Sequence, residues 1–182
     1  MTYTDPGTEY AQKVVNGEII ACKKVKQACK RHLNDLERMK DDDFAHIYIP
    51  KRAEIVIKFM EILPDISTGK PVKSAMFQKF IVYSLYGWYR KDNTDLRRFN
   101  KALISMARKN GKSFLISGIA IFEFLAGKHP KQNRQIYCTA QSREQASIVF
   151  NMVVQRLDGL LAKSEAIRKD VRKVRNEITQ NS

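Results

Sequence analysis

The residues best suited to chemistry lie in one short segment, 107–113, which ends in Gly111-Lys112-Ser113. Gly111 has no side chain to keep the backbone away from a bound phosphate. Lys112 would neutralise charge on the β- and γ-phosphates of a nucleoside triphosphate, and the Ser113 hydroxyl would ligate Mg²⁺. Because Gly-Lys-Ser tripeptides also occur by chance, the assignment of a phosphate-binding loop depends on the elements on either side.

A strand before the loop and a helix after it would position these groups. The apolar run 102–104 predicts a buried strand, and the stretch 114–126 predicts an apolar helix whose first amides point at the phosphates. Residues 135–140 predict a second strand, and Ser142 with Gln145 forms a capping box that begins another helix. This order predicts a right-handed crossover and an α/β fold with a parallel sheet, as in P-loop NTPases.

The residues upstream of the loop have a different pattern, because their apolar positions recur at helical spacing. Helices are predicted at 19–39, 50–63 and 75–89, and the first of these is amphipathic with many lysines on its polar side. The sequence therefore divides into a helical N-terminal region, 1–95, and the first part of a P-loop ATPase core, 96–182.

Charge and cysteine content narrow the class of protein. The 33 Lys and Arg residues exceed the 19 Asp and Glu residues by 33 − 19 = 14 charges, which favours a polyanionic partner such as nucleic acid, although such a surplus also aids solubility. No apolar run is long enough to span a membrane and no secretory signal is present, so an intracellular protein is expected. Cys22, Cys29 and Cys138 suit a reducing compartment, and small core residues are favoured over a zinc site formed with His32.

The loop departs from the usual phosphate-binding pattern, because Met106 stands where a glycine is expected and Arg108 lies inside the loop. The string Arg-Lys-Asn-Gly-Lys-Ser at 108–113 matches the loop of one family of large terminase subunits of tailed bacteriophages, and the sequence resembles that family along nearly its whole length. Further matching segments, in the family's order, are 14–19, 31–37, 59–64, 77–78, 85–88, 97–99, 140–146 and 148–150.

The resemblance implies an ATPase that uses ATP and Mg²⁺ to drive double-stranded DNA into a procapsid. It implies that the portal protein and the small terminase subunit are partners and that the full-length protein forms a homo-oligomeric ring. It also implies that the protein is located in the host cytoplasm, docks transiently on the portal and has no membrane partner. It places Gln78 near adenine and Arg108 near the γ-phosphate, where an amide and a cation suit these groups. Alternatively, Gln78 is a surface polar residue and Arg108 contacts DNA or a neighbouring subunit.

The candidate nucleotide contacts are therefore Gln78, Ala107, Arg108, Lys109, Asn110, Gly111, Lys112 and Ser113, with Lys112 and Arg108 as catalytic residues and Ser113 on the metal.

The 182 residues contain no apolar strand that ends in Asp-Glu and no cluster of acidic nuclease ligands. The chain is thus expected to bind nucleotide as the N-terminal ATPase segment of such a protein, without the Walker B region and the nuclease domain, and to hydrolyse almost none alone. Two alternatives remain: another P-loop NTPase such as a helicase, and a noncatalytic module in which the basic helix 19–39 binds nucleic acid or the small terminase subunit.

Overall fold

The computed structural model describes residues 4–127, 134–174 and 177–180, which belong to two compact units. The first unit comprises residues up to 58 together with 74–104, and the second comprises 59–73 together with the residues from 105 onward. The helices and strands, in chain order, are α1 (Pro6–Val15), α2 (Lys23–Arg38), β1 (His46–Tyr48), α3 (Pro50–Ile62), α4 (Met76–Gly87), β2 (Trp88–Arg90), α5 (Lys112–Ala126), α6 (Arg143–Leu161), α7 (Glu165–Asp170), β3 (Val171–Val174) and β4 (Glu177–Gln180).

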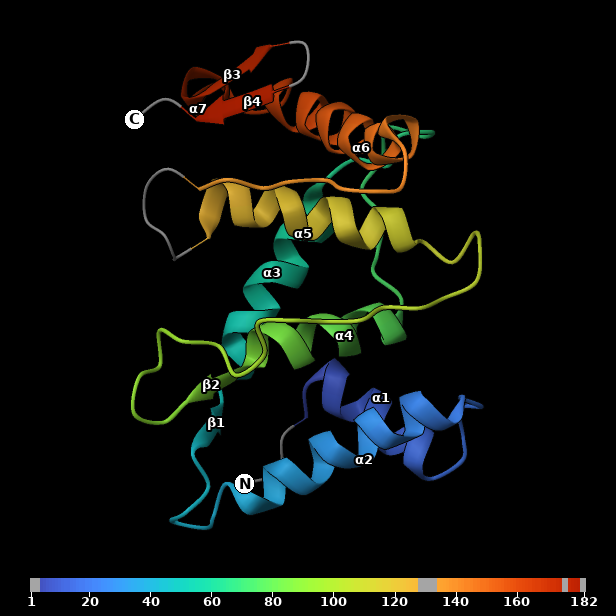
Figure 1. The fold of residues 1–182 in the computed structure, drawn as a ribbon, viewed down its shortest axis with the longest axis vertical. Helices are drawn as coiled ribbons and strands as arrows, with labels where there is room; N and C mark the ends of the chain where they lie inside the picture. The colour runs from blue at the N-terminus through green and yellow to red at the C-terminus, as the bar shows by residue number, and fades with distance from the viewer. Residues whose placement is uncertain (1–3, 128–133, 175–176, 181–182) are drawn as a thin grey trace. The chain divides into compact units, whose positions relative to one another are not determined.

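The core of the first unit forms where α1 packs against both α2 and α4 (Figure 1). Its buried residues come from all three helices and comprise Tyr10, Ala11, Val14, Cys29 and Phe80. The start of α1 is fixed by Asp5, whose carboxylate accepts hydrogen bonds of 3.0 Å from the amides of Gly7 and Thr8. Such an N-cap satisfies amides that have no partner within the helix, so it determines where α1 begins.

A short antiparallel ladder also belongs to the first unit. β1 pairs with β2 in the register His46↔Arg90, Ile47↔Tyr89 and Tyr48↔Trp88. The expectation that residues 1–95 are entirely helical is therefore wrong at these two strands. The ladder joins residues that are about forty positions apart, and a pattern read along three residues gives no information about so distant a partner.

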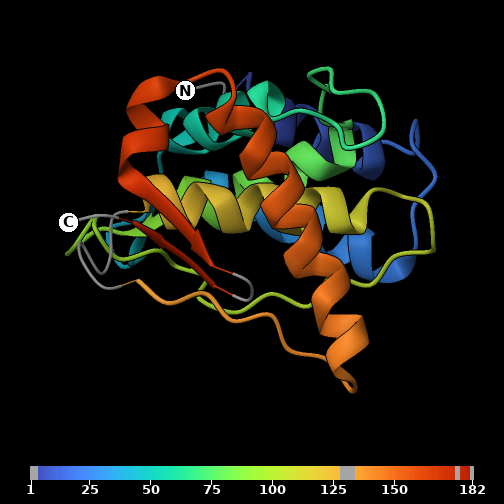
Figure 2. The ribbon, with the colours of Figure 1, turned by 90° about the horizontal axis from the view of Figure 1, so that it is seen from above.

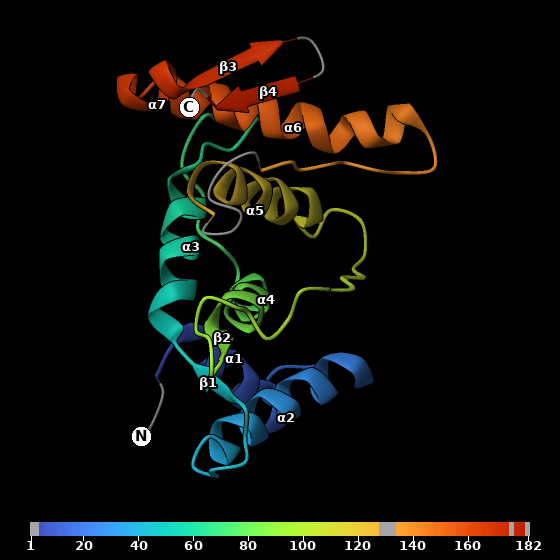
Figure 3. The same ribbon diagram turned by 60° about the vertical axis from the view of Figure 1, so that its left-hand side comes forward.

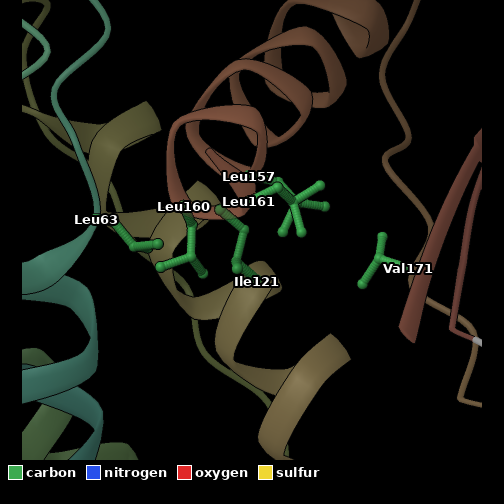
Figure 4. Close-up of a cluster of buried hydrophobic side chains, with 6 residues drawn as sticks. All are labelled: Leu63, Ile121, Leu157, Leu160, Leu161 and Val171. Carbon is green, nitrogen blue, oxygen red and sulfur yellow. The ribbon is translucent and has the colours of Figure 1, made fainter. Parts of the chain in front are cut away.

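The second unit is organised by α6, which crosses and packs against α5 (Figure 2). A buried cluster of leucines, Ile121 and Val171 fills the space between α5, α6, the residues after α3 and the start of β3 (Figure 4). Its members are Leu63, Ile121, Leu157, Leu160, Leu161 and Val171. The antiparallel ladder of β3 and β4 lies beside α6 (Figure 3), and the sequence pattern of the charged tail did not predict it.

The structure confirms the helices predicted from apolar periodicity: 19–39, 50–63, 75–89 and 114–126 correspond to α2, α3, α4 and α5. It also confirms the helix after Ser142, whose hydroxyl accepts a hydrogen bond of 3.3 Å from the Gln145 amide. The division between 95 and 96 stays a prediction, because compact units do not by themselves say where an ATPase domain begins.

The prediction of one strand before the loop and a second strand after the helix that follows it is wrong. Neither 102–104 nor 135–140 forms a strand, and both ladders between described residues are antiparallel, so no parallel sheet is present there. Leu103 is 98% exposed and Tyr137 is 76% exposed. A strand inside a parallel sheet needs hydrogen-bonding neighbours and covered faces, and an apolar run alone does not supply them.

The cysteines were predicted to be small core residues, and the structure confirms this only for Cys29. Cys29 is fully buried in the first unit, and burial raises the pKa of its thiol to about 11. Cys22, expected in the core, is instead exposed at the N-cap of α2, and Cys138 is half-buried. Among the described residues, no group of three or more His, Cys, Asp or Glu side chains could hold a metal ion.

Candidate nucleotide-binding site

The loop before α5 has a backbone shape that suits an anion. Lys109 has φ 65° and Gly111 has φ 71°, so both lie in the left-handed region. A lysine adopts this conformation only at a cost in energy, whereas glycine adopts it freely. Successive residues that alternate in this way can turn their amides into a concave nest for phosphate oxygens.

The side chain of Asn110 supports this turn from within the loop. Its Nδ2 lies 3.3 Å from the carbonyl oxygens of both Ala107 and Arg108 and donates to them. The two carbonyls are thereby held on the side of Asn110. The side-chain amide of Asn110 thus stabilises the loop itself, whereas the sequence predicted only that Asn110 contacts the nucleotide.

The first turn of α5 begins directly at the loop. Gly111 is its N-cap and offers no side-chain acceptor, and the Leu115 amide donates to the Gly111 carbonyl at 2.9 Å. No acidic side chain occupies this turn. The start of α5 therefore carries the positive end of a helix dipole and amides without side-chain caps, which together favour a bound phosphate.

The charged side chains of the loop reach solvent. Arg108, Lys109 and Lys112 are exposed, and Ser113 is half-buried at the start of α5. Within the described part of the chain, no carboxylate pairs with Arg108 or Lys112. Both cations are thus available to offset the charge of a triphosphate, and the Ser113 hydroxyl lies next to Lys112, where it could contribute one oxygen ligand to Mg²⁺.

A buried arginine of α6, Arg156, forms hydrogen bonds with the first turns of α5. The Nη1 of Arg156 donates to the Phe114 carbonyl at 2.8 Å and to Ser117 Oγ at 2.9 Å, and its Nε donates to the Pro64 carbonyl at 3.2 Å. Its guanidinium also lies 4.0 Å from the centre of the Phe114 ring. Burial lowers the pKa of Arg156 to about 10, and carbonyl and hydroxyl oxygens solvate the charge in place of water.

Arg156 is the residue at this site that sequence reasoning missed. It is 1% exposed and lies one position before Leu157, on the apolar face of α6. An arginine at an apolar position of an amphipathic helix is the signal that could have found it, because such a side chain needs several acceptors when buried.

Gln78 lies in the first unit, whereas the loop 107–113 belongs to the second. It is buried near the start of α4, and its Oε1 accepts a hydrogen bond of 3.0 Å from the Ala75 amide. Gln78 therefore caps α4, a local role that its position three residues after Ala75 permits. The structure brings together the seven loop residues, and it gives Gln78 this separate structural contact.

None of the helices among the described residues is both long and apolar enough to cross a bilayer.

Comparison with known proteins gives three concordant matches. A family model described as "Terminase large subunit, ATPase domain" matches residues 76–182. The terminase large subunit of Enterobacteria phage HK97 is 40% identical over 111 residues, which cover 59% of this chain and 20% of that protein. The crystal structure of the HK97 bacteriophage large terminase matches with a TM-score of 0.56 and 32% identity over 71% of this chain and 25% of that one. The chain thus spans about a fifth of the length of its curated relative.

Proposed function

Because the chain belongs to the family of terminase large subunit ATPase domains, we propose that it binds ATP with Mg²⁺ to power the packaging of double-stranded DNA. The matched residues, 76–182, include both Gln78 and the loop 107–113. The observation that carries the proposal is the loop itself, in which left-handed Lys109 and Gly111 lead directly into the first turn of α5.

Each loop residue has a proposed role that follows from its chemistry. The Lys112 ammonium contacts the β- and γ-phosphates, and the Ser113 hydroxyl ligates Mg²⁺. The amides of residues 107–111 surround the phosphates, as expected for a glycine-containing turn before a helix. The fold we propose around this loop is that of a P-loop NTPase.

Two further roles rest on the resemblance to phage terminases. Arg108 is proposed to lie near the γ-phosphate, where a guanidinium would offset charge that develops during phosphoryl transfer. Gln78 is proposed to lie near adenine, because a side-chain amide can both donate to and accept from the edge of the base.

The wider setting is also proposed from the resemblance to the large terminase subunits of tailed phages. We propose the portal protein of the procapsid and a small terminase subunit as partners, and a homo-oligomeric ring that docks on the portal in the host cytoplasm. Since the sequence contains no apolar run that ends in Asp-Glu, we expect this chain by itself to bind ATP with negligible turnover. The family match disfavours a helicase or another P-loop class.

Calorimetric titration with ATP and Mg²⁺ tests the loop. In Lys112→Ala, we expect affinity to fall by about tenfold to a hundredfold, because a charged hydrogen-bonding partner contributes about 1.5–3 kcal/mol. Lys101→Ala removes the same charge from an exposed position before the loop and should bind as the unaltered chain does. Equal ATP affinity in Lys112→Ala and the unaltered chain would refute the assignment.

A further inference from the structure

The outer face of α2 carries a strong surplus of positive charge. Nine side chains of this 16-residue helix are exposed, and at 100° per residue they fall within one arc of about 160°. Six are basic and one is acidic, a local surplus of 6 − 1 = 5 charges. The nine are Lys23, Lys24, Lys26, Gln27, Lys30, Arg31, Asn34, Glu37 and Arg38.

The opposite face of α2 is fixed to the unit, so the basic face is held in place. Cys29, His32 and Asp35 are buried. Asp35 forms an ion pair of 2.7 Å with Arg98, and His32 accepts a hydrogen bond of 3.1 Å from the Trp88 indole. Because α2 packs on α1 and presents its other side outward (Figures 1 and 3), a partner could reach the basic face without unfolding the helix.

Most of the positive charge of this face lies in the first half of α2. Among ion pairs between described residues, none involves Lys23, Lys24, Lys26 or Lys30. Lys23 and Lys26 are three residues apart, and Lys26 and Lys30 are four apart, so these ammonium groups repel each other along one side of the helix. The acidic run 41–43 follows the other end of the helix. A bound polyanion would relieve this repulsion.

The composition of the face distinguishes among nucleic acids. No aromatic side chain is among its nine exposed residues, so it offers no platform for stacking the bases of a single strand. Lysine ammonium groups act as point charges, which suit phosphates better than base edges. The basic run from 23 to 31 rises about 12 Å, over which duplex DNA presents about seven phosphate charges on its two strands.

We propose that the outer face of α2 binds the phosphate backbone of duplex DNA without reading its sequence. The identification of the duplex with packaged DNA rests on the proposed function, but the binding itself needs neither ATP nor the loop 107–113.

A pair of variants with equal net charge tests this surface. One replaces four lysines of α2 by glutamine, and the control replaces four exposed lysines of α3 and the residues that follow it. Each has a net charge of 14 − 4 = +10. The two variants are K23Q/K24Q/K26Q/K30Q and K51Q/K58Q/K70Q/K73Q.

Fluorescence anisotropy with a labelled duplex of about 30 base pairs, from about 50 to 200 mM NaCl without nucleotide, gives affinity and its salt dependence. We expect the α2 variant to bind at least about tenfold more weakly near 0.1 M salt. Its slope of log affinity against log salt should be less negative by up to about 3.6, or about 0.9 for each lost phosphate contact. The control should keep most of both quantities.

Equal weakening in the two variants would overturn the proposal, because bulk charge would then explain binding. Unchanged binding in the α2 variant would also overturn it and would leave an acidic protein as the partner of this face. If circular dichroism shows that the fourfold variant unfolds, K23Q/K24Q and K26Q/K30Q replace it, and each should reduce the slope by up to about 1.8. If the unaltered chain binds the duplex but shows no ATP binding by calorimetry, the proposed function fails while the proposal for α2 stands.

Discussion

One buried polar side chain in each unit, His32 in the first and Arg156 in the second, makes hydrogen bonds to more than one neighbouring segment. The indole of Trp88 can only donate, so His32 Nδ1 accepts its hydrogen bond and Nε2 carries the ring proton. That Nε2 donates to Thr8 Oγ1 at 3.0 Å, and the Thr8 hydroxyl donates to Asp5 Oδ2 at 2.7 Å. Neutral His32 therefore connects α2, β2 and the N-cap of α1.

If His32 were protonated, its Nδ1–H would face the Trp88 indole N–H, and two donors would meet without an acceptor. Burial lowers the pKa of the His32 imidazole to about 4 from its ordinary 6.5. Since the unfolded chain binds this proton at higher pH than the folded chain, stability should be lost as pH falls below about 6.5. The loss from pH 7 to pH 5 should be about 2 kcal/mol. Urea unfolding at the two pH values measures it.

In His32→Asn most of this pH dependence should disappear, because the amide does not titrate. His46→Asn is the matched control: the pKa of His46 is also lowered, mainly by burial, but this ring lies on the partly exposed strand β1 and should contribute less. Equal pH dependence in His32→Asn and the unaltered chain would contradict the role given to His32.

Residue chemistry alone predicted much of the candidate site. Gly111, Lys112 and Ser113 could be assigned because glycine, lysine and serine at that spacing each suit one need of a bound triphosphate. Arg156 could not, since its acceptors on Phe114 and Pro64 become neighbours only after α5 and the end of α3 pack against α6. The capping contact of Gln78 with Ala75, by contrast, spans only three residues and was open to prediction from the sequence.

At the scale of elements, two glycines of the second unit allow α5 and α6 to approach Met60 and Pro64 closely. A Cβ on Gly118 of α5 would lie 3.0 Å from Met60 side-chain atoms, and a Cβ on Gly159 of α6 would lie 2.4 Å from Pro64 Cγ. The ring of Pro64 cannot rotate away as a flexible side chain would. The second contact is therefore the more demanding, and Gly159 determines how near α6 comes to the turn after α3.

For Gly159→Ala we expect a loss of about 1–3 kcal/mol in the free energy of unfolding, through overpacking against Pro64. Helix propensity alone predicts the opposite, a gain of about 1 kcal/mol, so the sign of the change decides the question. Thermal or urea unfolding followed by circular dichroism gives the value. Gln155→Ala, at an exposed position of the same helix, should stay within about 0.5 kcal/mol of the unaltered chain.

Helices were predictable where strands were not. α2, α3, α5 and α6 each bury one face, and that periodicity is visible in a few consecutive turns of sequence. A strand also depends on its neighbour: β1 finds its partner about forty residues away, whereas the apolar run 102–104 has none among the described residues. The tail 165–180 carried too little apolar pattern to reveal α7 or the ladder of β3 and β4.

At the scale of the whole molecule, each compact unit has its own buried cluster, and the single tryptophan belongs to the first. Trp88 is 1% exposed, so its fluorescence should change when the first unit unfolds. Far-ultraviolet circular dichroism instead reports helices of both units. The two probes can thus separate the stability of one unit from that of the other.

We expect Gly159→Ala to move part of the circular-dichroism transition to lower urea while the midpoint of Trp88 fluorescence stays constant. His32→Asn should do the reverse and lower the fluorescence midpoint, because it alters the contact with the indole itself. If both probes shift together by the same amount in both variants, the chain unfolds as one cooperative unit, and the prediction of separable units fails.

The segments around Leu103 and Tyr137, which precede and follow α5 in the chain, bear on how readily the protein aggregates. Leu103 and Tyr137 present apolar surface to water, and the backbone around them belongs to no ladder in the described part of the chain. Such segments can pair between molecules, and the net charge of +14 keeps those molecules apart. Salt shortens the range of that repulsion to about 10 Å near 0.1 M. Added salt should therefore have two effects at once: it weakens the duplex binding proposed for α2, and it shortens the time for which the chain stays monodisperse.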